Sequence, residues 1–147
     1  MTAADRDRLD EVLEAHAAFY AAFEKSDFDA MEAMWAEDEG VVCVHPGAEP
    51  IRGRSAVMRS WLVLMAGAPY IQFFLTDVQA SVVGDIASVT CTENVLSAGA
   101  DTPVGVFAGG SAAATNVLRY TSQGWRLWIH HASPVLSSTE PSQEDSP

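Results

Sequence analysis

The apolar residues of the N-terminal segment recur at intervals of three and four, which is the spacing of one face of an α-helix. Charged residues fall between them, and the repeating positions within residues 5–25 are Leu9, Val12, Leu13, His16, Phe19, Tyr20 and Phe23. This pattern predicts an amphipathic helix of about five turns. Two shorter helices are predicted after it, at 28–36 behind the candidate N-cap Asp27 and at 55–65 behind the candidate N-cap Ser55.

After residue 70 the pattern changes to the two-residue alternation of β-strands, interrupted by short polar segments. The predicted strands cover residues 71–79, 86–96, 107–120 and 125–135, and a short apolar strand at 41–45 ends at Pro46-Gly47. The spacing of the long strands suits consecutive antiparallel pairing. Helices followed by a long meander predict an α+β domain in which the helices cover one face of the sheet.

The last two strands decide which polar side chains face the helices, because side chains alternate between the two faces of a strand. A turn at 122–124 with a loop of two or four residues sets Asn116 opposite His131. The other face carries two arginines and is expected to point outward, because an unpaired buried guanidinium is very costly. Asn116 and His131 then lie side by side on the inward face, and His130 points outward. A three-residue loop would instead set Asn116 opposite His130.

A second chemical signal lies in the strand predicted at 86–96. Its alternate residues form an apolar row with a single carboxylate, namely Ala87, Val89, Cys91, Glu93 and Val95. A lone carboxylate among apolar neighbours has a raised pKa unless it is paired, and proton-transferring acids are tuned in this way. The alternative is a structural ion pair with a cation such as Arg54 or Arg59. Glu93 and His131 are therefore candidate acids or bases, and Asn116 is a candidate hydrogen-bond donor to a developing oxyanion.

Four aromatic residues and a further histidine are candidates for the wall of a pocket, namely Tyr20, Trp35, His45, Trp61 and Phe73. Each has an alternative, because buried aromatic residues more often fill a core and His45 can cap the turn that follows it. The potential metal ligands His45, Glu93 and His131 come from different strands, so no metal site is predicted. No serine or cysteine lies in a nucleophile motif, and no cofactor is expected.

Length and composition narrow the class of protein further. A chain of 147 residues with 48% apolar content can bury a core as one domain, and Cys43 and Cys91 are interpreted as buried free thiols. The charged N-terminus is unlike a signal peptide and no apolar run approaches a membrane span, so a cytoplasmic protein without membrane contact is expected. The net charge of −12 disfavours nucleic acid as a partner.

Several short segments have a familiar order and spacing, namely Val42–Gly47, Ile51–Arg54, Ser60-Trp61, Cys91–Glu93, Ala114–Asn116, Gly124–Leu127 and His130–Pro134. Together they resemble the SnoaL-like branch of the nuclear-transport-factor-two-like superfamily, over about residues 5 to 135. The resemblance implies a cone-shaped domain with three N-terminal helices packed on a curved antiparallel sheet. It also implies a pocket at the open end and a homodimer formed by the outer face of the sheet. Residues 1–136 would form this domain, and 137–147 would be a disordered acidic tail.

The resemblance leaves the activity open, because the superfamily includes isomerases, cyclases, dehydratases and hydrolases as well as non-catalytic binding and association domains. The first hypothesis is a cofactor-free isomerase, cyclase or dehydratase that uses acid–base chemistry on a small apolar or aromatic molecule. The second is a non-catalytic ligand-binding or dimerisation module. Glu93 has the character of the single acid or base that SnoaL-like cyclases use, although no motif assigns it that role.

Overall fold

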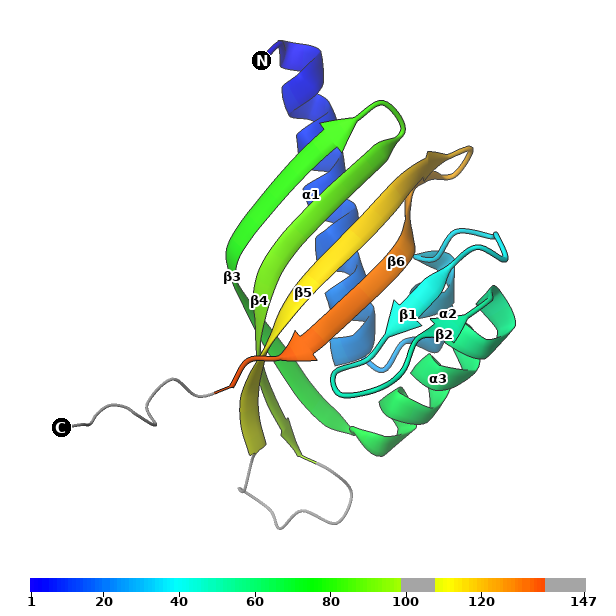
Figure 1. Cartoon of the computed structure of the whole chain (residues 1–147), viewed down its shortest axis with the longest axis vertical. Helices are drawn as coiled ribbons and strands as arrows, with labels where there is room; N and C mark the ends of the chain where they lie inside the picture. Colours follow the sequence, from blue (N-terminus) through cyan, green and yellow to red (C-terminus); the bar gives the residue numbers. More distant parts are fainter. Residues whose placement is uncertain (99–107, 137–147) are drawn as a thin grey trace, which may run out of the picture.

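The structure is a computed structural model that describes residues 1–98 and 108–136. Its helices are α1 (Ala3–Glu24), α2 (Phe28–Ala33) and α3 (Arg54–Gly67). Its strands are β1 (Val42–Val44), β2 (Ile51–Arg52), β3 (Tyr70–Val83), β4 (Ile86–Ala98), β5 (Ala108–Thr121) and β6 (Gly124–Pro134). All six strands form one sheet in the order β2-β1-β6-β5-β4-β3 (Figure 1). The tail predicted at 137–147 lies outside the described residues.

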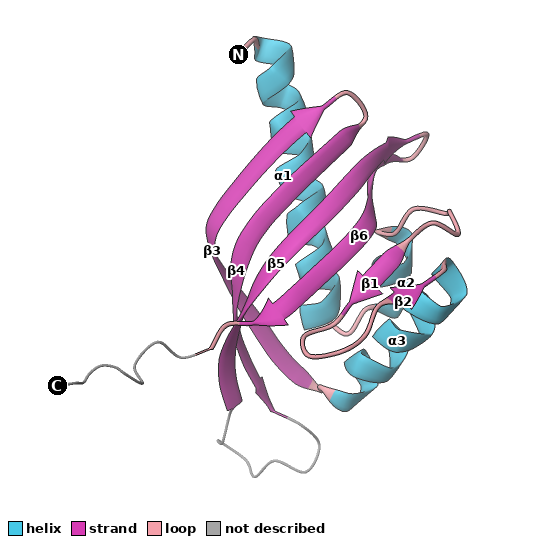
Figure 2. Ribbon diagram, viewed as in Figure 1, coloured by secondary structure: helices cyan, strands magenta, loops and turns pink. Residues whose placement is uncertain are grey.

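The sheet confirms the predicted meander and corrects its description as purely antiparallel. Strands β3, β4, β5 and β6 pair antiparallel in chain order. Strand β1 pairs antiparallel with β2 but parallel with β6, so the sheet is mixed. Figure 2 shows α1 crossing behind the long strands, with α3 beside β1 and β2. None of the described helices is long and apolar enough to cross a membrane.

The first helix follows the predicted amphipathic pattern. It begins with a capping box, in which the Thr2 hydroxyl accepts from the Asp5 N–H at 3.1 Å and the Asp5 carboxylate accepts from the Thr2 N–H at 2.9 Å. Its buried side chains are Val12, His16, Phe19, Tyr20, Ala22 and Phe23. This stripe lies against the inner face of the sheet, so His16 and Tyr20 are carried into the interior.

The second helix is shorter than predicted and ends at Ala33, so the structure has two long helices and one short helix ahead of the long strands. Its N-cap is Asp27 as predicted, since the carboxylate accepts from the Ala30 N–H at 3.0 Å. The helix stops because the next residues join the sheet. The Leu127 N–H donates to the carbonyl of Met34 at 2.8 Å, and the Ala36 N–H donates to the carbonyl of Leu127 at 2.9 Å.

The hairpin of β5 and β6 contains the departure that matters most for the site. The turn has a two-residue loop, which is one of the predicted lengths. Further along, Leu118 pairs with Leu127, yet its neighbour Val117 pairs with Ile129. Trp128 is therefore an extra residue in β6, which makes a β-bulge. Beyond a bulge the alternation of side chains between the two faces is reversed.

The bulge overturns the predicted positions of the two histidines that follow it. Asn116 pairs with His130, and His131 pairs with Thr115. The side chain of His130 is buried on the inward face, and that of His131 is exposed on the outer face. The inward placement of His131 is therefore wrong. Its cause is an inserted strand residue rather than the three-residue loop that the sequence left as the alternative.

Candidate functional site

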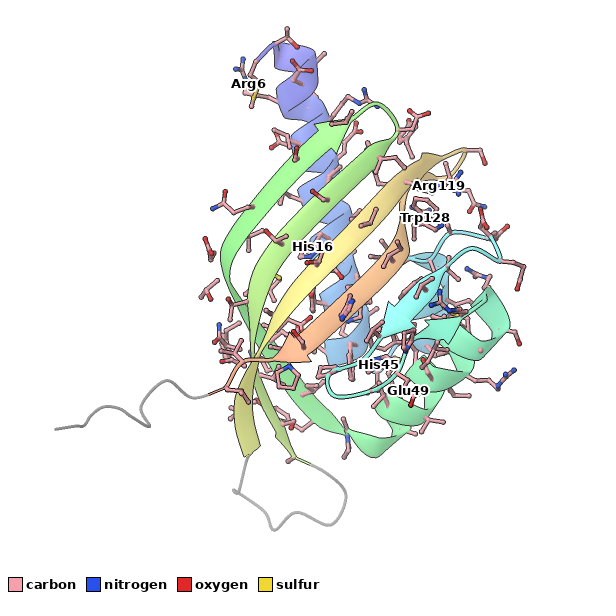
Figure 3. The ribbon with its side chains drawn as sticks, in the orientation of Figure 1. Arg6, His16, His45, Glu49, Arg119 and Trp128 are labelled. Atoms are coloured by element: carbon pink, nitrogen blue, oxygen red, sulfur yellow. The ribbon has the colours of Figure 1, made fainter. Side chains whose placement is uncertain are left out.

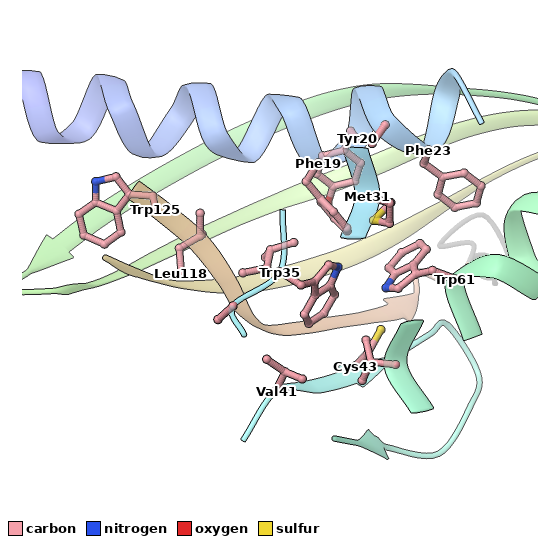
Figure 4. Close-up of a cluster of buried hydrophobic side chains, with 14 of the residues drawn as sticks. Phe19, Tyr20, Phe23, Met31, Trp35, Val41, Cys43, Trp61, Leu118 and Trp125 are labelled. Atoms are coloured by element: carbon pink, nitrogen blue, oxygen red, sulfur yellow. The ribbon is translucent and has the colours of Figure 1, made fainter. Parts of the chain in front are cut away.

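A cavity of about 390 Å³ lies between α1, α3 and one end of the long strands, where β3 and β5 begin and β4 ends. Its apolar wall comes mainly from Phe19, Phe23, Trp61, Leu64, Ile71 and Phe73. Its polar lining consists of Tyr20, His45, Glu93, Ser97, Ser111 and His130. Figure 4 shows the aromatic side chains of α1 and Trp61 of α3 from this region. A mostly apolar cavity of this size with a few convergent polar groups is typical of a small-molecule site.

Five of the predicted site residues line this cavity, namely Tyr20, His45, Trp61, Phe73 and Glu93. Trp35 does not line it, because its backbone bridges to Leu127 of the sheet and its indole, 1% exposed, packs in the core. Asn116 is 0% exposed and lies behind the cavity wall. His131 is on the opposite face of the sheet, and its place on the inward face is taken by His130.

The Glu93 carboxylate is buried, and Tyr20 is its hydrogen-bond partner. The Tyr20 hydroxyl donates to Oε2 at 2.6 Å. The suggested ion pairs are absent among the described residues, because Arg54 donates to the carbonyls of Glu32, Trp35 and Ala36 and Arg59 donates to the Ser55 hydroxyl. Burial raises the pKa of the Glu93 carboxyl, although the hydrogen bond from Tyr20 opposes this. A carboxyl with a raised pKa beside a cavity is suited to proton transfer.

Asn116 connects three buried polar side chains behind Glu93. Its Nδ2 donates to Nε2 of His16 at 2.9 Å and to the Tyr20 hydroxyl at 3.1 Å, and its Oδ1 lies at hydrogen-bond distance from Nδ1 of His130. Both amide hydrogens are therefore used inside the protein. Asn116 has no hydrogen left for an oxyanion, so it orients its neighbours instead of taking the expected role as an oxyanion donor.

The two histidines bound to Asn116 are neutral at neutral pH. Burial lowers the pKa of His16 to about 4. Burial, with smaller effects from the neighbouring histidines, lowers the pKa of His130 to about 3. The desolvation of a positive charge explains the direction of both shifts. His16 lies on α1 behind the strands in Figure 3, where its imidazole accepts from Asn116 without a charge.

A third histidine reaches the cavity from the end of β1. His45 Nε2 lies 2.9 Å from the hydroxyl oxygen of Ser60, which itself donates to the carbonyl of Val57 at 2.7 Å. The imidazole of His45 lies against Trp61, with ring centroids 4.8 Å apart, and its centroid is 6.4 Å from that of His130. Burial lowers the pKa of His45. Two neutral imidazoles thus lie close together at one side of the cavity.

Sequence reasoning missed His130 and the bond from Tyr20 to Glu93. A signal for His130 exists in β6, because Trp128 and Ile129 are successive large apolar residues and break the alternation expected of a half-buried strand. The Tyr20–Glu93 bond joins residues 73 positions apart, and no local pattern marks it. Among the described residues, no group of three or more His, Cys, Asp or Glu side chains is gathered as a metal site would require.

The sheet with helices on one side and a cavity at one end places the protein among nuclear-transport-factor-two-like folds. A model of the SnoaL-like domain matches residues 12–137, so the chain belongs to the SnoaL-like domain family. A candidate dehydratase of the NTF2-like family from Streptomyces avermitilis is 46% identical, with a TM-score of 0.83 over 90% of this chain and 99% of that chain.

Two further comparisons show how varied the relatives are. A candidate calcium/calmodulin-dependent protein kinase type II association domain from Thiobacillus denitrificans is 36% identical, with a TM-score of 0.71 over 83% of this chain and 93% of that chain. The F-box protein SKIP8 of Arabidopsis thaliana is 23% identical over 85% of this chain. The present chain spans half the length of that plant protein, 50% of it.

Proposed function

We propose that this protein is a cofactor-independent isomerase, cyclase or dehydratase that moves a proton on a small apolar or aromatic substrate. The observation that carries this proposal is the environment of Glu93. Its carboxylate faces an apolar cavity, has no ion pair among the described residues, and is held by the hydroxyl of Tyr20. A structural carboxylate in such a position would be expected to have a cationic partner.

In the proposed reaction Glu93 acts as general base and then as general acid. One carboxylate oxygen is fixed by Tyr20, which leaves the other free to take a proton from a carbon of the bound substrate. The electron pair of the broken C–H bond moves into the substrate. Glu93 then returns the proton to another atom of an isomer or cyclised product, or to a departing hydroxyl group, which leaves as water in a dehydration.

The comparisons support this class of reaction and also the alternative. The similarity to the candidate dehydratase of Streptomyces avermitilis favours the enzyme. The similarity to the candidate association domain of Thiobacillus denitrificans favours a module that assembles or binds without catalysis. The buried carboxylate supports the enzyme over the module, because an association module has no need of a buried acid without a cationic partner in a cavity.

The proposal is tested by hydrogen exchange on a panel of cyclic ketones that carry two or more hydroxyl groups, in deuterated water, followed by mass spectrometry. The protein should accelerate deuterium uptake at the carbon beside the carbonyl, and Glu93→Gln should abolish this acceleration. Glu49→Gln, which changes an exposed carboxylate on the β1–β2 connection, serves as the matched control. Equal exchange by Glu93→Gln and the unaltered protein would remove Glu93 from the role of base.

The stability of the same variant gives a test that needs no substrate. The pKa of Glu93 is raised in the folded state, so the folded protein holds this proton more tightly than the unfolded chain. The free energy of unfolding is therefore highest below the ordinary carboxyl pKa and falls as pH rises through the pKa of the folded state. Glu93→Gln should therefore be as stable as the unaltered protein or more stable at neutral pH, with the advantage vanishing toward about pH 4. A loss of about 3 kcal/mol or more in urea denaturation would instead indicate a broken structural pair.

We further propose that the protein forms a homodimer through the outer face of the sheet. The Arg119 guanidinium lies over Trp128, 4.9 Å from the ring centroid (Figure 3). Thr115 and His131 are exposed on the same face of the sheet. Aromatic and arginine side chains are enriched in interface cores. Light scattering should give the mass of a dimer at micromolar concentration, and Thr115→Arg should shift it to that of a monomer. A monomer mass for the unaltered protein would contradict this.

A further inference from the structure

The hydrogen bonds around the cavity determine which of its polar atoms carry hydrogens. We propose that the cavity binds its ligand through the ligand's own hydroxyl hydrogens, because the polar side chains that face it present hydrogen-bond acceptors. The inference rests on the proposed function only in placing the ligand beside Glu93. It adds a substrate class, namely a cyclic compound that carries at least two hydroxyl groups.

The orientation of His130 follows from its bond to Asn116. The amide nitrogen of Asn116 donates to His16 and Tyr20, so the atom that faces His130 is the amide oxygen, which only accepts. Nδ1 of His130 must therefore carry the hydrogen. In the neutral imidazole Nε2 then has a lone pair, and it lies on the side of the ring turned away from Asn116. Because His130 lines the cavity, it offers an acceptor to a ligand.

The hydrogen bonds of His45, on the other side of the cavity, also determine which of its ring nitrogens carries the hydrogen. The single hydroxyl hydrogen of Ser60 is donated to the carbonyl of Val57, so Nε2 of His45 must donate to the Ser60 oxygen. Nδ1 of His45 then carries a lone pair, and the thiol sulfur of Cys43 lies 3.8 Å from it. Glu93 in its ionised form has only acceptors, and Tyr20 occupies one of its oxygens. Glu93 and His130 therefore offer at least one acceptor each, and His45 presents no free donor.

The donors closest to Glu93 and the histidines are already used or covered. The hydroxyl of Tyr20 donates to Glu93 at 2.6 Å, and that of Ser111 donates to Oδ1 of Asn94 at 2.9 Å. The indole N–H of Trp61 has no partner among the described residues, but it is buried inside the wall. The Ser97 hydroxyl has no hydrogen-bond partner among the described residues, yet it lies four residues beyond Glu93 on β4, which is about 13 Å along the strand.

This arrangement selects against ligands that approach with oxygen lone pairs. A ketone or ether oxygen beside Glu93 or His130 would leave both itself and the protein acceptor without a hydrogen. A carboxylate or phosphate would also meet no cation, because no lysine or arginine lines the cavity among the described residues. Hydroxyl groups on a ring satisfy the acceptors, and the aromatic wall packs against the ring.

Asn116 is the residue that sets this polarity without contacting the ligand. Its amide holds His16 and His130 in the tautomer with hydrogen on Nδ1, and it leaves the Tyr20 hydrogen directed at Glu93. Nitrogen-15 NMR of the histidine-labelled protein distinguishes the two neutral tautomers directly. We expect hydrogen on Nδ1 for His16 and His130 and on Nε2 for His45. Hydrogen on Nε2 of His130 would overturn the inference, and this readout involves no activity.

The ligand preference is tested with a naphthalenediol that has neighbouring hydroxyl groups and with its dimethyl ether, by titration calorimetry at about pH 8, which favours the ionised form of Glu93 over the protonated form present at low pH. The diol should bind about tenfold more tightly or better, because two hydrogen bonds to buried acceptors are made by the diol alone. Equal affinities, or no binding of the diol at millimolar concentration, would overturn the inference.

Two variants test whether the hydrogen-bond acceptors of the cavity cause the preference for the diol over the ether. Asn116→Leu should lower the preference for the diol over the ether, and its refolded state is checked by circular dichroism. His130→Leu should lower the same preference and serves if Asn116→Leu does not fold. If the preference is absent while Glu93→Gln still abolishes deuterium exchange, the inference fails and the proposed function stands. If the preference is present without exchange, the proposed function fails alone.

Discussion

The two ends of the inner sheet face are covered by the same helix but are built differently. Toward the β5–β6 turn, Leu118, Trp125 and Leu127 are buried and fill the space under α1. Toward the other end, the inward row of β5 continues with Ala114, Ala112 and Gly110, and the cavity lies there. The difference shows that the size of side chains along one strand decides where the interior is filled and where it is open.

Asn116 lies at the boundary between these two ends. It precedes Leu118 in the inward row of β5 and follows Ala114, so it separates the filled core from the cavity. Its hydrogen bonds hold side chains from α1 and β6 in fixed orientations. We therefore expect the filled end to contribute most to the free energy of unfolding. We expect Asn116, at the boundary, to fix the orientation of the polar side chains beside the cavity. Each end is expected to respond differently to substitution.

The largest effect on stability is expected at the filled end. Leu118→Ala removes a side chain that is 0% exposed and leaves a cavity, so it should lower the free energy of unfolding by about 2–5 kcal/mol. Urea denaturation followed by circular dichroism measures this loss. Leu62→Ala is the matched control, because that leucine is 51% exposed on α3 and its removal should cost less than about 1 kcal/mol. Equal losses would contradict the comparison.

A smaller loss is expected at the boundary. Asn116→Leu keeps the volume but removes the shared partner of Tyr20, His16 and His130. Tyr20 keeps its bond to Glu93, so the cost comes from the two imidazoles, at about 1–3 kcal/mol for each one that finds no other partner or water. A total near 3 kcal/mol is expected in the same denaturation experiment. A variant as stable as the unaltered protein would show that the network does not order the interior.

The neighbouring histidines of β6 give a sharper test of the bulge. His130→Ala should lower the free energy of unfolding by about 1–3 kcal/mol, because it leaves the amide oxygen of Asn116 buried without a donor. His131→Ala should change it by less than about 0.5 kcal/mol, because that side chain is exposed. The reverse order of effects would restore the register that the sequence predicts.

The same pair of histidines shows how far sequence reasoning reaches. Alternation along β4 and β5 predicts both strands and the inward position of Glu93, because no extra residue disturbs the row that contains it. In β6 one inserted residue, Trp128, exchanges His130 and His131. The helix–sheet contact between Tyr20 and Glu93 could not be predicted, because it depends on how α1 lies across the sheet. In a strand without a bulge, the alternation of side chains predicts which face of the sheet a residue occupies, but it does not predict which side chain of another element that residue contacts.

The smallest effect on stability and a large effect on binding are expected from filling the open end. Ala112 lines the cavity and pairs directly with Glu93 across β4 and β5, so Ala112→Leu places a larger side chain beside the carboxylate. Overpacking costs about 1–3 kcal/mol where a core is tightly packed, and here the leucine can extend into empty space, so a loss below about 1 kcal/mol is expected. Ala113→Leu makes the same change on the outer face, where the side chain is exposed.

Calorimetry with the naphthalenediol should show that Ala112→Leu loses binding while Ala113→Leu keeps it. The added methyl groups occupy volume that the ring would fill, and they also deepen the burial of Glu93, which raises its pKa further. Exchange should therefore be slower in Ala112→Leu, and the exchange that remains should need a higher pH than in the unaltered protein, since the base must be ionised to accept a proton. If Ala112→Leu binds the diol unchanged, the ligand occupies another surface, and the open end of the sheet is not the binding site.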